Sequence, residues 1–216
     1  MTKGKRKKPV DHRTRVGQER SARTETRILE AALKVFAELG PDAAKIDDFV
    51  EAAGISRGTF YNYFESVEEL LHATSEWTTR TLLDTVERAL EGVEGPVLRY
   101  GVGTRLFLAK ARRDPVWCLF VARVWKLGGL EGALRDLEEG LRLGVFRAPS
   151  LEAARAIVFG GVREALFHIG SGRASPAYGD DVTETCLQAL GVDARRIAAV
   201  RKHELPSWQP NEEVES

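Results

Sequence analysis

"GISRGTFYNYF" spans residues 54–64 and encodes a turn followed by a short helix with two unlike faces. Gly54 suits a tight turn because glycine takes a positive φ at little steric cost. Ser56 can cap the next helix by accepting a hydrogen bond from an early backbone amide. Phe60 and Phe64 are then four residues apart and share one face of the helix. We expect that face to pack against the rest of the chain while the opposite side stays polar.

The opposite side of this helix carries residue types that can bind DNA. The major groove admits an α-helix and displays base edges, so Arg57 can fork onto a guanine and Asn62 can pair with an adenine or with a phosphate. Gly58 lets the backbone approach a nucleic acid closely, and Thr59 and Tyr61 offer hydroxyls to phosphates. From the pattern alone, an ordinary amphipathic helix with exposed tyrosines is an equally good interpretation.

Helical periodicity dominates the remaining sequence, and the sequence contains no convincing alternating strand pattern. The first amphipathic segment stops at Gly40-Pro41, and Ser66 with Glu69 forms a capping box that opens a long helix. We therefore predict an all-α fold, with helices over residues 24–39, 46–53, 56–64, 66–90, 96–112, 115–127, 130–143, 151–170 and 177–190, and a short one from 193.

Charge is balanced overall but uneven along the chain. Lys+Arg and Asp+Glu both number 32, so net charge indicates no partner. Residues 1–27 hold ten basic groups and three acidic ones, whereas residues 204–216 hold four glutamates and no basic residue. A basic arm can pair loosely with phosphates, although a solvated tail has the same composition. We expect a disordered basic arm over residues 1–22 and an acidic tail over 206–216.

The sequence gives no sign of export, a membrane span or a metal site. The N-terminal segment lacks the apolar stretch of a signal peptide, and the longest apolar run, 116–122, is too short to cross a bilayer. Cys118 and Cys186 are far apart and have no histidine or cysteine at metal-ligand spacing. We expect a reducing cytoplasm, no cofactor, no metal, and cysteines that pack in the core rather than sense oxidants.

Two adjoining segments resemble the N-terminal domain of the TetR family of bacterial transcriptional repressors. They are TRILEAALKVFAELG (26–40) and IDDFVEAAGISRGTFYNYFESVEELL (46–71), within a similarity that spans roughly residues 24–75. The resemblance implies a DNA-binding domain over 23–72, with a helix-turn-helix over 45–64 and a recognition helix over 57–63. It also implies a homodimer that reads a palindromic operator on double-stranded DNA, with each half-site in successive major grooves.

Two positions depart from the family pattern around the predicted DNA contacts. Lys45 stands where a threonine is frequent, and a lysine there can still meet a phosphate. Val67, preceded by Glu65, stands where a lysine is common, so one phosphate contact is lost and we expect a lowered affinity. Tyr63 is expected either to contact a phosphate or to be half-buried. The predicted DNA-binding residues are Lys45, Ser56, Arg57, Gly58, Thr59, Tyr61, Asn62 and Tyr63.

Residues 73–205 resemble the second domain of the family more loosely, which implies a region for dimerisation and ligand binding. Small residues line one side of the predicted helix over 151–170, and small residues let helices from two subunits approach closely. Packing within a monomer is the alternative explanation. The predicted dimer interface consists of Ala153, Ile157, Gly160, Gly161, Glu164, Leu187 and Leu190.

Large rings gather near residues 107–125, where core packing and a ligand cavity both explain them. Ligand cavities are mostly apolar with few polar groups, so a ligand there would be a small hydrophobic molecule. It would act through different affinities for the DNA-bound and free conformations, by moving the helix over 66–90. The candidate lining residues are Phe107, Trp117, Phe120, Val121, Trp125 and His168.

A ligand-responsive repressor is therefore the leading hypothesis for function. An enzyme would need a nucleophile with a base, a metal cluster or a phosphate loop, and the sequence contains none of these patterns. The glycine-bearing segment GVGTRLF (101–107) lacks the lysine and the preceding strand of a phosphate loop. A helical dimeric adaptor without sequence-specific DNA binding remains the alternative.

Overall fold

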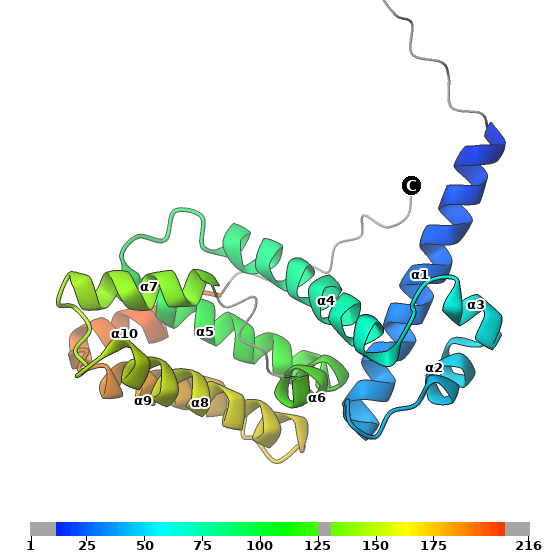
Figure 1. The fold of residues 1–216 in the computed structure, drawn as a ribbon. Coiled ribbons are helices and arrows are strands. Elements are labelled where there is room, and N and C mark those ends of the chain that lie inside the picture. Colours follow the sequence, from blue (N-terminus) through cyan, green and yellow to red (C-terminus); the bar gives the residue numbers. More distant parts are fainter. Residues whose placement is uncertain (1–11, 125–130, 206–216) are drawn as a thin grey trace, which may run out of the picture.

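The computed structural model describes residues 12–124 and 131–205, and within these ranges every regular element is a helix (Figure 1). The predicted all-α fold is confirmed, although residues 125–127 of the predicted sixth helix lie outside the described ranges. The helices are α1 (His12–Leu39), α2 (Ile46–Ala53), α3 (Arg57–Tyr61), α4 (Val67–Ala89), α5 (Pro96–Arg113), α6 (Pro115–Val124), α7 (Glu131–Arg142), α8 (Leu151–Gly170), α9 (Tyr178–Ala189) and α10 (Ala194–Lys202).

The first three helices and the start of α4 form a small domain around an aromatic core. Phe36, Phe49 and Phe60 have no exposed surface, and the ring centroids of Phe36 and Phe49 are 4.8 Å apart. Phe64 and Leu70 belong to the same core. Because aromatic side chains bury large apolar areas and gain further from contact with one another, this cluster fixes how α2 and α3 pack on α1.

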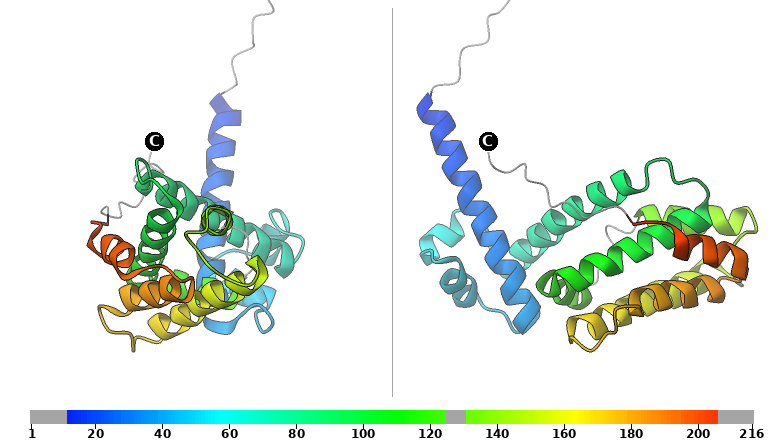
Figure 2. Two further views of the ribbon diagram at one scale, coloured as in Figure 1. Left: turned by 90° about the vertical axis from the view of Figure 1, so that its left-hand side faces the viewer. Right: turned by 180° about the vertical axis from the view of Figure 1, so that it is seen from behind.

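The expected disorder of residues 1–22 is wrong for residues 12–22, because α1 runs without a break from His12 (Figure 2). Residues 16–23 are all exposed, so this part of α1 has no buried face. It extends a helix that is already nucleated, and its arginine, glutamate and alanine are good helix formers. A search for apolar periodicity misses such a segment. Residues 1–11 and the predicted acidic tail lie outside the described ranges.

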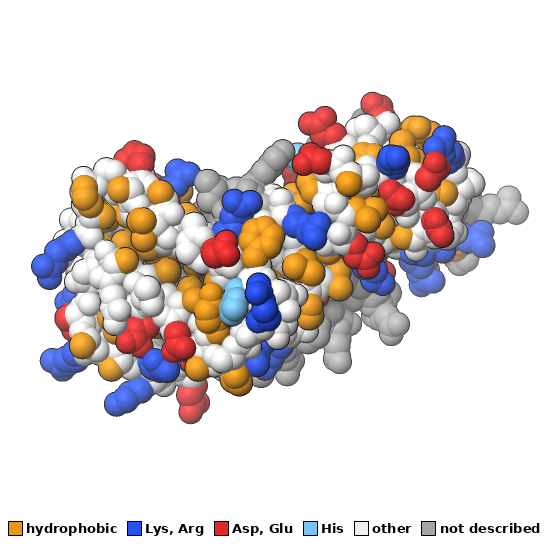
Figure 3. All heavy atoms as spheres, turned by 90° about the horizontal axis from the view of Figure 1, so that it is seen from below, with side chains coloured by type: hydrophobic (Ala, Val, Ile, Leu, Met, Phe, Trp, Pro, Cys, Tyr) orange, Lys and Arg blue, Asp and Glu red, His pale blue; other side chains and the backbone are white. Residues whose placement is uncertain are grey.

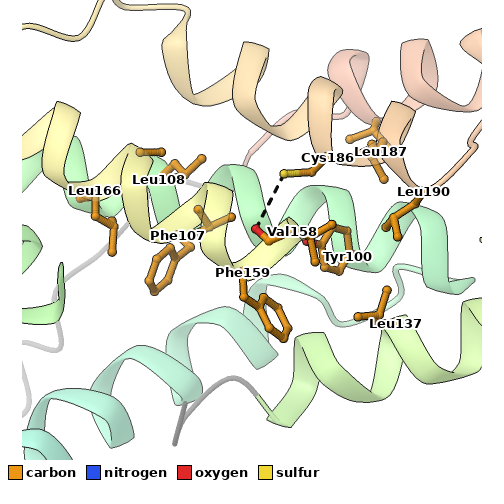
Figure 4. Close-up of a cluster of buried hydrophobic side chains, with 14 of the residues drawn as sticks. Tyr100, Phe107, Leu108, Leu137, Val158, Phe159, Leu166, Cys186, Leu187 and Leu190 are labelled. Atoms are coloured by element: carbon orange, nitrogen blue, oxygen red, sulfur yellow. Dashed lines mark hydrogen bonds between the residues drawn. The ribbon is translucent and has the colours of Figure 1, made fainter. Parts of the chain in front are cut away.

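Helix α5 runs through the second domain, with α7, α8, α9 and α10 packed on it (Figures 1 and 2). It is buried around much of its circumference, which includes Tyr100, Phe107 and Leu108. Figure 4 shows Val158 and Leu166 of α8 in the same core. A helix that is apolar on several sides belongs inside a domain, and α5 occupies that place here.

Helices α4 and α6 belong to both domains. On α6, Phe120 joins the N-terminal core with its ring centroid 6.2 Å from that of Phe36. Cys118 on the same helix is buried in the second core, where its Sγ donates to the Leu166 carbonyl oxygen at 3.1 Å. Helix α4 likewise begins in the first core and reaches the second at Leu82. The two domains are therefore joined by shared, packed helices.

Phe120→Ala is expected to lower the free energy of unfolding by about 3–5 kcal/mol, because it removes buried apolar surface and leaves a cavity between the domains. Urea unfolding followed by circular dichroism measures the change. Val116→Ala, on the same helix at 38% exposure, is the control, and we expect a change of about 0.5 kcal/mol or less. Equal losses in the two variants would contradict the assigned role of Phe120.

Candidate nucleic-acid interface and cavity

A tight turn sets the angle between α2 and α3. Gly54 follows α2 with φ 61° and ψ 44°, in the left-handed region that favours glycine. The Ile55 amide donates to the Val50 carbonyl oxygen at 3.1 Å, which closes the turn. Ser56 then caps α3, as expected from the sequence. The two helices form a helix-turn-helix.

Helix α3 buries one aromatic residue and exposes a polar edge. Phe60 is fully buried, whereas Arg57, Gly58 and Asn62 are exposed and Tyr61 is 52% exposed. The helix ends at Tyr61, before the predicted end. The edge expected to face DNA lies on the surface of the chain rather than inside it.

Two of the predicted DNA-binding hydroxyls hold the start of α3. The Thr59 amide donates to Ser56 Oγ at 3.0 Å, and the hydroxyl oxygens of Ser56 and Thr59 are 2.9 Å apart. The bond from the amide satisfies a donor that has no partner within the helix. Ser56 therefore positions α3 in the free protein.

Tyr63, at the end of the predicted recognition segment (residues 57–63), contacts α1. It is half-buried, and its hydroxyl is 3.2 Å from Ser21 Oγ. Its backbone amide donates to the Phe60 carbonyl oxygen at 2.9 Å, so it stays in the turn that follows α3. The contact places the N-terminal part of α1, with exposed Arg20 and Arg23, beside the recognition segment.

Arg57 forms a two-bond ion pair with Asp47 of α2. Its Nε and one Nη donate to the two carboxylate oxygens at 2.7 and 2.8 Å, and the side chains are 60% and 70% exposed. The hydrogen bond from Arg57 lowers the pKa of Asp47, and the same bond raises the pKa of Arg57. Sequence reasoning missed Asp47, because the helix dipole already explains an acidic residue in a first turn.

The two departures from the family pattern have different surroundings. Lys45 is exposed just before α2, and its backbone amide donates to the Asp48 carboxylate at 2.7 Å. Val67, the first residue of α4, is partly buried against the N-terminal core, so it packs inward. Glu65 is exposed, and its backbone amide donates to the Glu69 carboxylate at 2.6 Å.

A cavity lies in the second domain between α4, α5, α7 and α8. Its volume is about 70 Å³, and it opens to solvent on one side. Side chains from three of these helices form apolar walls, among them Leu82, Val86, Phe107, Phe159 and Val162. Its walls therefore suit the apolar part of a small ligand.

Charged side chains in the cavity lining are paired with one another. Arg99 of α5 meets Asp136 of α7 at 3.1 Å, and Arg135 of α7 meets Glu87 of α4 at 3.5 Å. Arg99 also donates to the carbonyl oxygen of Leu90, at the end of α4, at 3.3 Å. These pairs link the end of α4 to α5 and α7, and the charges of the described lining residues cancel.

Tyr100 is a lining residue that sequence reasoning did not select. It is 1% exposed, and its hydroxyl has no hydrogen-bond partner among the residues that the structure describes. Burial raises the pKa of this phenol above its ordinary value, so it stays neutral and keeps its proton for donation. A buried polar group without a partner is costly to stability.

Most of the residues predicted to line a ligand site lie outside this cavity. Phe107 does line the cavity. Trp117 is buried against Phe107, with ring centroids 5.3 Å apart, and is not among the described lining residues. Phe120 packs in the N-terminal core instead, because α6 is shared between the domains.

The remaining cavity candidates also lie elsewhere. Val121 is partly buried and packs against both cores, and His168 packs against Tyr178 with tilted rings whose centroids are 4.6 Å apart. Neither is among the described lining residues. Trp125 lies outside the described ranges. Aromatic rings at helical spacing here mark the contacts of α6, which sequence alone does not distinguish from a cavity wall.

One face of α8 has the exposure that a dimer interface needs. Ala153, Gly160, Gly161 and Glu164 are exposed, and Ile157 is 63% exposed. A Cβ added at Gly160 would have no neighbour within 4 Å, so packing within the described chain does not explain this glycine. Seen from below in Figure 3, uncharged and hydrophobic side chains cover much of the region around α8 and α9.

Leu187 and Leu190 do not belong to this face, which corrects the prediction. They are 0% and 1% exposed and pack in the core of their own chain, which also contains Tyr100 (Figure 4). The outer side of α9 carries Thr185 and Gln188. A helix packed on one side only buries its apolar residues inward, and the sequence does not state which neighbour covers them.

Within residues 12–124 and 131–205, no helix has the length and apolar character to cross a bilayer. The same residues contain no group of three or more His, Cys, Asp or Glu placed to hold a metal ion. Burial raises the pKa of Cys118 and Cys186 to about 11, so both thiols stay protonated near neutral pH.

Known proteins match part of the chain. Residues 28–74 match the family described as "Bacterial regulatory proteins, tetR family". The uncharacterized HTH-type transcriptional regulator YvdT of Bacillus subtilis (strain 168) is 43% identical over 68 residues, which are 32% of this chain and 35% of YvdT. The HTH-type transcriptional repressor KstR2 of Mycobacterium tuberculosis is 36% identical over 86 residues, which cover 37% of this chain and 42% of KstR2. The matches thus span about a third to two fifths of these relatives.

Solved structures extend the similarity to most of the fold. RolR in complex with resorcinol aligns with a TM-score of 0.64 and 25% identity, over 88% of this chain and 98% of RolR. RolR without ligand aligns with a TM-score of 0.65 and 26% identity, over 85% and 98%. A helix-turn-helix on a second helical domain defines the class of helix-turn-helix regulators. Residues 28–74 form a DNA-binding domain of the TetR family, and the whole chain resembles regulators of that family in its fold.

Proposed function

We propose that this regulator is a repressor that binds a palindromic operator as a homodimer and leaves it when a small, largely apolar effector fills the cavity. The observation that carries the proposal is the polar edge of α3, exposed while Phe60 is fixed behind it. Arg57 and Asn62 suit base edges, and the hydroxyl of Tyr61 suits a phosphate. The repressor name of KstR2 supports the sign of control, and the resorcinol bound to RolR supports a small ligand.

The N-terminal part of α1 adds positive charge to the proposed interface. The contact between Ser21 and Tyr63 holds this part beside the recognition segment. Arg20, Arg23 and Arg27 are exposed along it and are available for phosphates that flank each half-site. Such contacts add affinity without adding sequence information.

The proposed homodimer uses the exposed face of α8 together with the outer side of α9. Two helices from each subunit then form a four-helix interface around a two-fold axis. Gly160 has open space around it, and Ile157 is an exposed apolar side chain for the partner to cover. The two-fold axis matches the symmetry of a palindromic operator.

Helix α4 is the proposed route from the effector to the DNA. Leu70, near its start, is fully buried in the N-terminal core, whereas Leu82, Val86 and Leu90 line the cavity. An effector that moves the end of α4 therefore moves the helix-turn-helix as well. It shifts the equilibrium only by the difference in its affinity for the free and DNA-bound conformations.

The lining of the cavity limits the chemistry of the effector. The charged side chains of its described lining are paired, so an ionised ligand would have to break one of these ion pairs before it could form its own. Its walls are mainly apolar, and the Tyr100 hydroxyl is a buried donor without a partner among the described residues. These features favour an uncharged ligand of small size with one group that accepts a hydrogen bond.

Selection from random double-stranded oligonucleotides with the full-length chain is expected to enrich an inverted repeat with half-sites about one helical turn apart. Arg57→Ala should fold normally, because the side chain is 60% exposed, yet weaken binding to the enriched operator about 5- to 150-fold. Fluorescence anisotropy at one fixed salt concentration measures this loss. A selection that enriches no repeat would instead favour the adaptor hypothesis.

Ile157→Asp is expected to convert the dimer to monomers, because it places a charge in the proposed apolar contact. Analytical ultracentrifugation measures the change. Leu143→Asp is the matched control, since Leu143 is 51% exposed but lies off the α8 face, and it should leave the dimer intact. The interface assignment is wrong if both variants stay dimeric.

Tyr100→Phe is expected to stabilise the ligand-free protein by about 1–3 kcal/mol, because it removes a buried hydroxyl that has no partner among the described residues. The same change should weaken binding of an uncharged aromatic alcohol about 3- to 10-fold, with resorcinol as the first probe. Thermal unfolding and isothermal titration calorimetry measure the two effects. Tyr178→Phe, outside the cavity lining, is the control, and an equal response in both variants would reject the assignment of Tyr100.

A further inference from the structure

The ion pair between Asp47 and Arg57 lies at the front of the proposed recognition surface. Arg57 is the first residue of α3, and Asp47 lies in the first turn of α2. Both side chains are mostly exposed, at 60% and 70%, so the pair contributes little to the stability of the fold. Its two short hydrogen bonds nevertheless hold the guanidinium in one orientation.

The geometry of the pair leaves one edge of Arg57 available. A guanidinium carries five N–H donors in a planar fork. Asp47 accepts from Nε and from one Nη, which together form the side edge of that fork. The other Nη takes part in no hydrogen bond among the described residues, so the end of the fork still offers parallel donors.

Guanine presents two acceptors, N7 and O6, to the major groove, and a pair of parallel donors matches them. The free end of the Arg57 fork has this form. An unbraced arginine has many rotamers and can turn instead to a nearby phosphate, which carries no sequence information. The Asp47 carboxylate opposes that turn, since it neutralises part of the arginine charge and repels phosphates.

We propose that Asp47 is a specificity-determining residue that holds Arg57 by its side edge so that its end edge reads a guanine in each half-site. This inference rests on the proposed operator binding and adds a role for a residue that does not itself contact the base. It predicts that the protein gains selectivity for guanine at the expense of general affinity for DNA.

The experiment compares full-length wild type with Asp47→Ala and Asp47→Asn. Arg57→Ala first identifies the operator position at which enrichment of guanine is lost. Duplexes with each of the four bases at that position are then titrated, together with an unrelated duplex.

Glu51→Ala is the matched control, because Glu51 is an exposed acid of the same helix and its replacement removes the same charge without touching the pair. Circular dichroism verifies that each variant is folded, and the Asp47→Asn variant keeps the shape of the side chain if the alanine variant is unstable.

Wild type is expected to prefer guanine by about 5- to 150-fold, the range for a bidentate contact. Asp47→Ala should reduce this preference at least about threefold, with equal or tighter binding to the unrelated duplex, and Asp47→Asn should change it in the same direction. Glu51→Ala should keep the preference. In the Arg57→Ala background, Asp47→Ala should have no further effect on base preference, because the Asp47 carboxylate then has no guanidinium to orient.

Four results would overturn the inference. Full guanine preference in the Asp47 variants would show that Arg57 does not need Asp47 to orient it. A higher preference would show that Asp47 competes with guanine for the Arg57 guanidinium. If no operator position responds to Arg57→Ala while wild type still enriches an inverted repeat, Arg57 does not read a base and the proposed function stands. If wild type enriches no repeat, the proposed function itself fails.

Discussion

Phe60 is the side chain on which the orientation of α3 depends. The helix has five residues, far too short to be stable alone, so its direction is set by what it buries. Phe60 is fully buried with Phe36 and Phe49, and the Gly54 turn and the Ser56 cap fix the path of the chain into the helix. With Phe60 inside, Arg57, Gly58 and Asn62 are left on the surface. The same burial therefore builds the core and presents the polar edge.

The small N-terminal core is not independent of the rest of the chain. Phe120 enters it from α6, while Cys118 of the same helix is buried in the second core. Helix α4 likewise extends from the N-terminal core to the cavity wall. Because densely packed elements transmit strain, this packing supports the proposal that a ligand at the far end of α4 acts on the helix-turn-helix. The arrangement provides a physical basis for control by an effector.

The proposed dimer interface and the cavity show that sequence patterns do not predict which apolar residues are buried and which stay exposed. Ile157 and Leu187 are both apolar residues at helical spacing, yet one is 63% exposed and the other fully buried. Trp117 and Phe107 are both large rings, yet only Phe107 is among the described cavity-lining residues. Periodicity identifies the apolar side of a helix, but it does not identify the neighbour that covers that side. Asp47 and Tyr100 were missed for a related reason, because their significance comes from the presence or absence of a partner in space among the described residues.

The sequence by itself determined the elements: most helix bounds to within a few residues, the glycine turn, the serine caps and the polar edge of α3. These features follow from interactions within one or two helical turns, which can be inferred from residues that are close in the sequence. Only the tertiary structure decided that α1 begins at His12, that α6 serves two cores, that the leucines of α9 face inward and that Arg57 is bound by Asp47. The shared α6 and the buried leucines depend on packing between segments far apart in the chain, which no local pattern encodes.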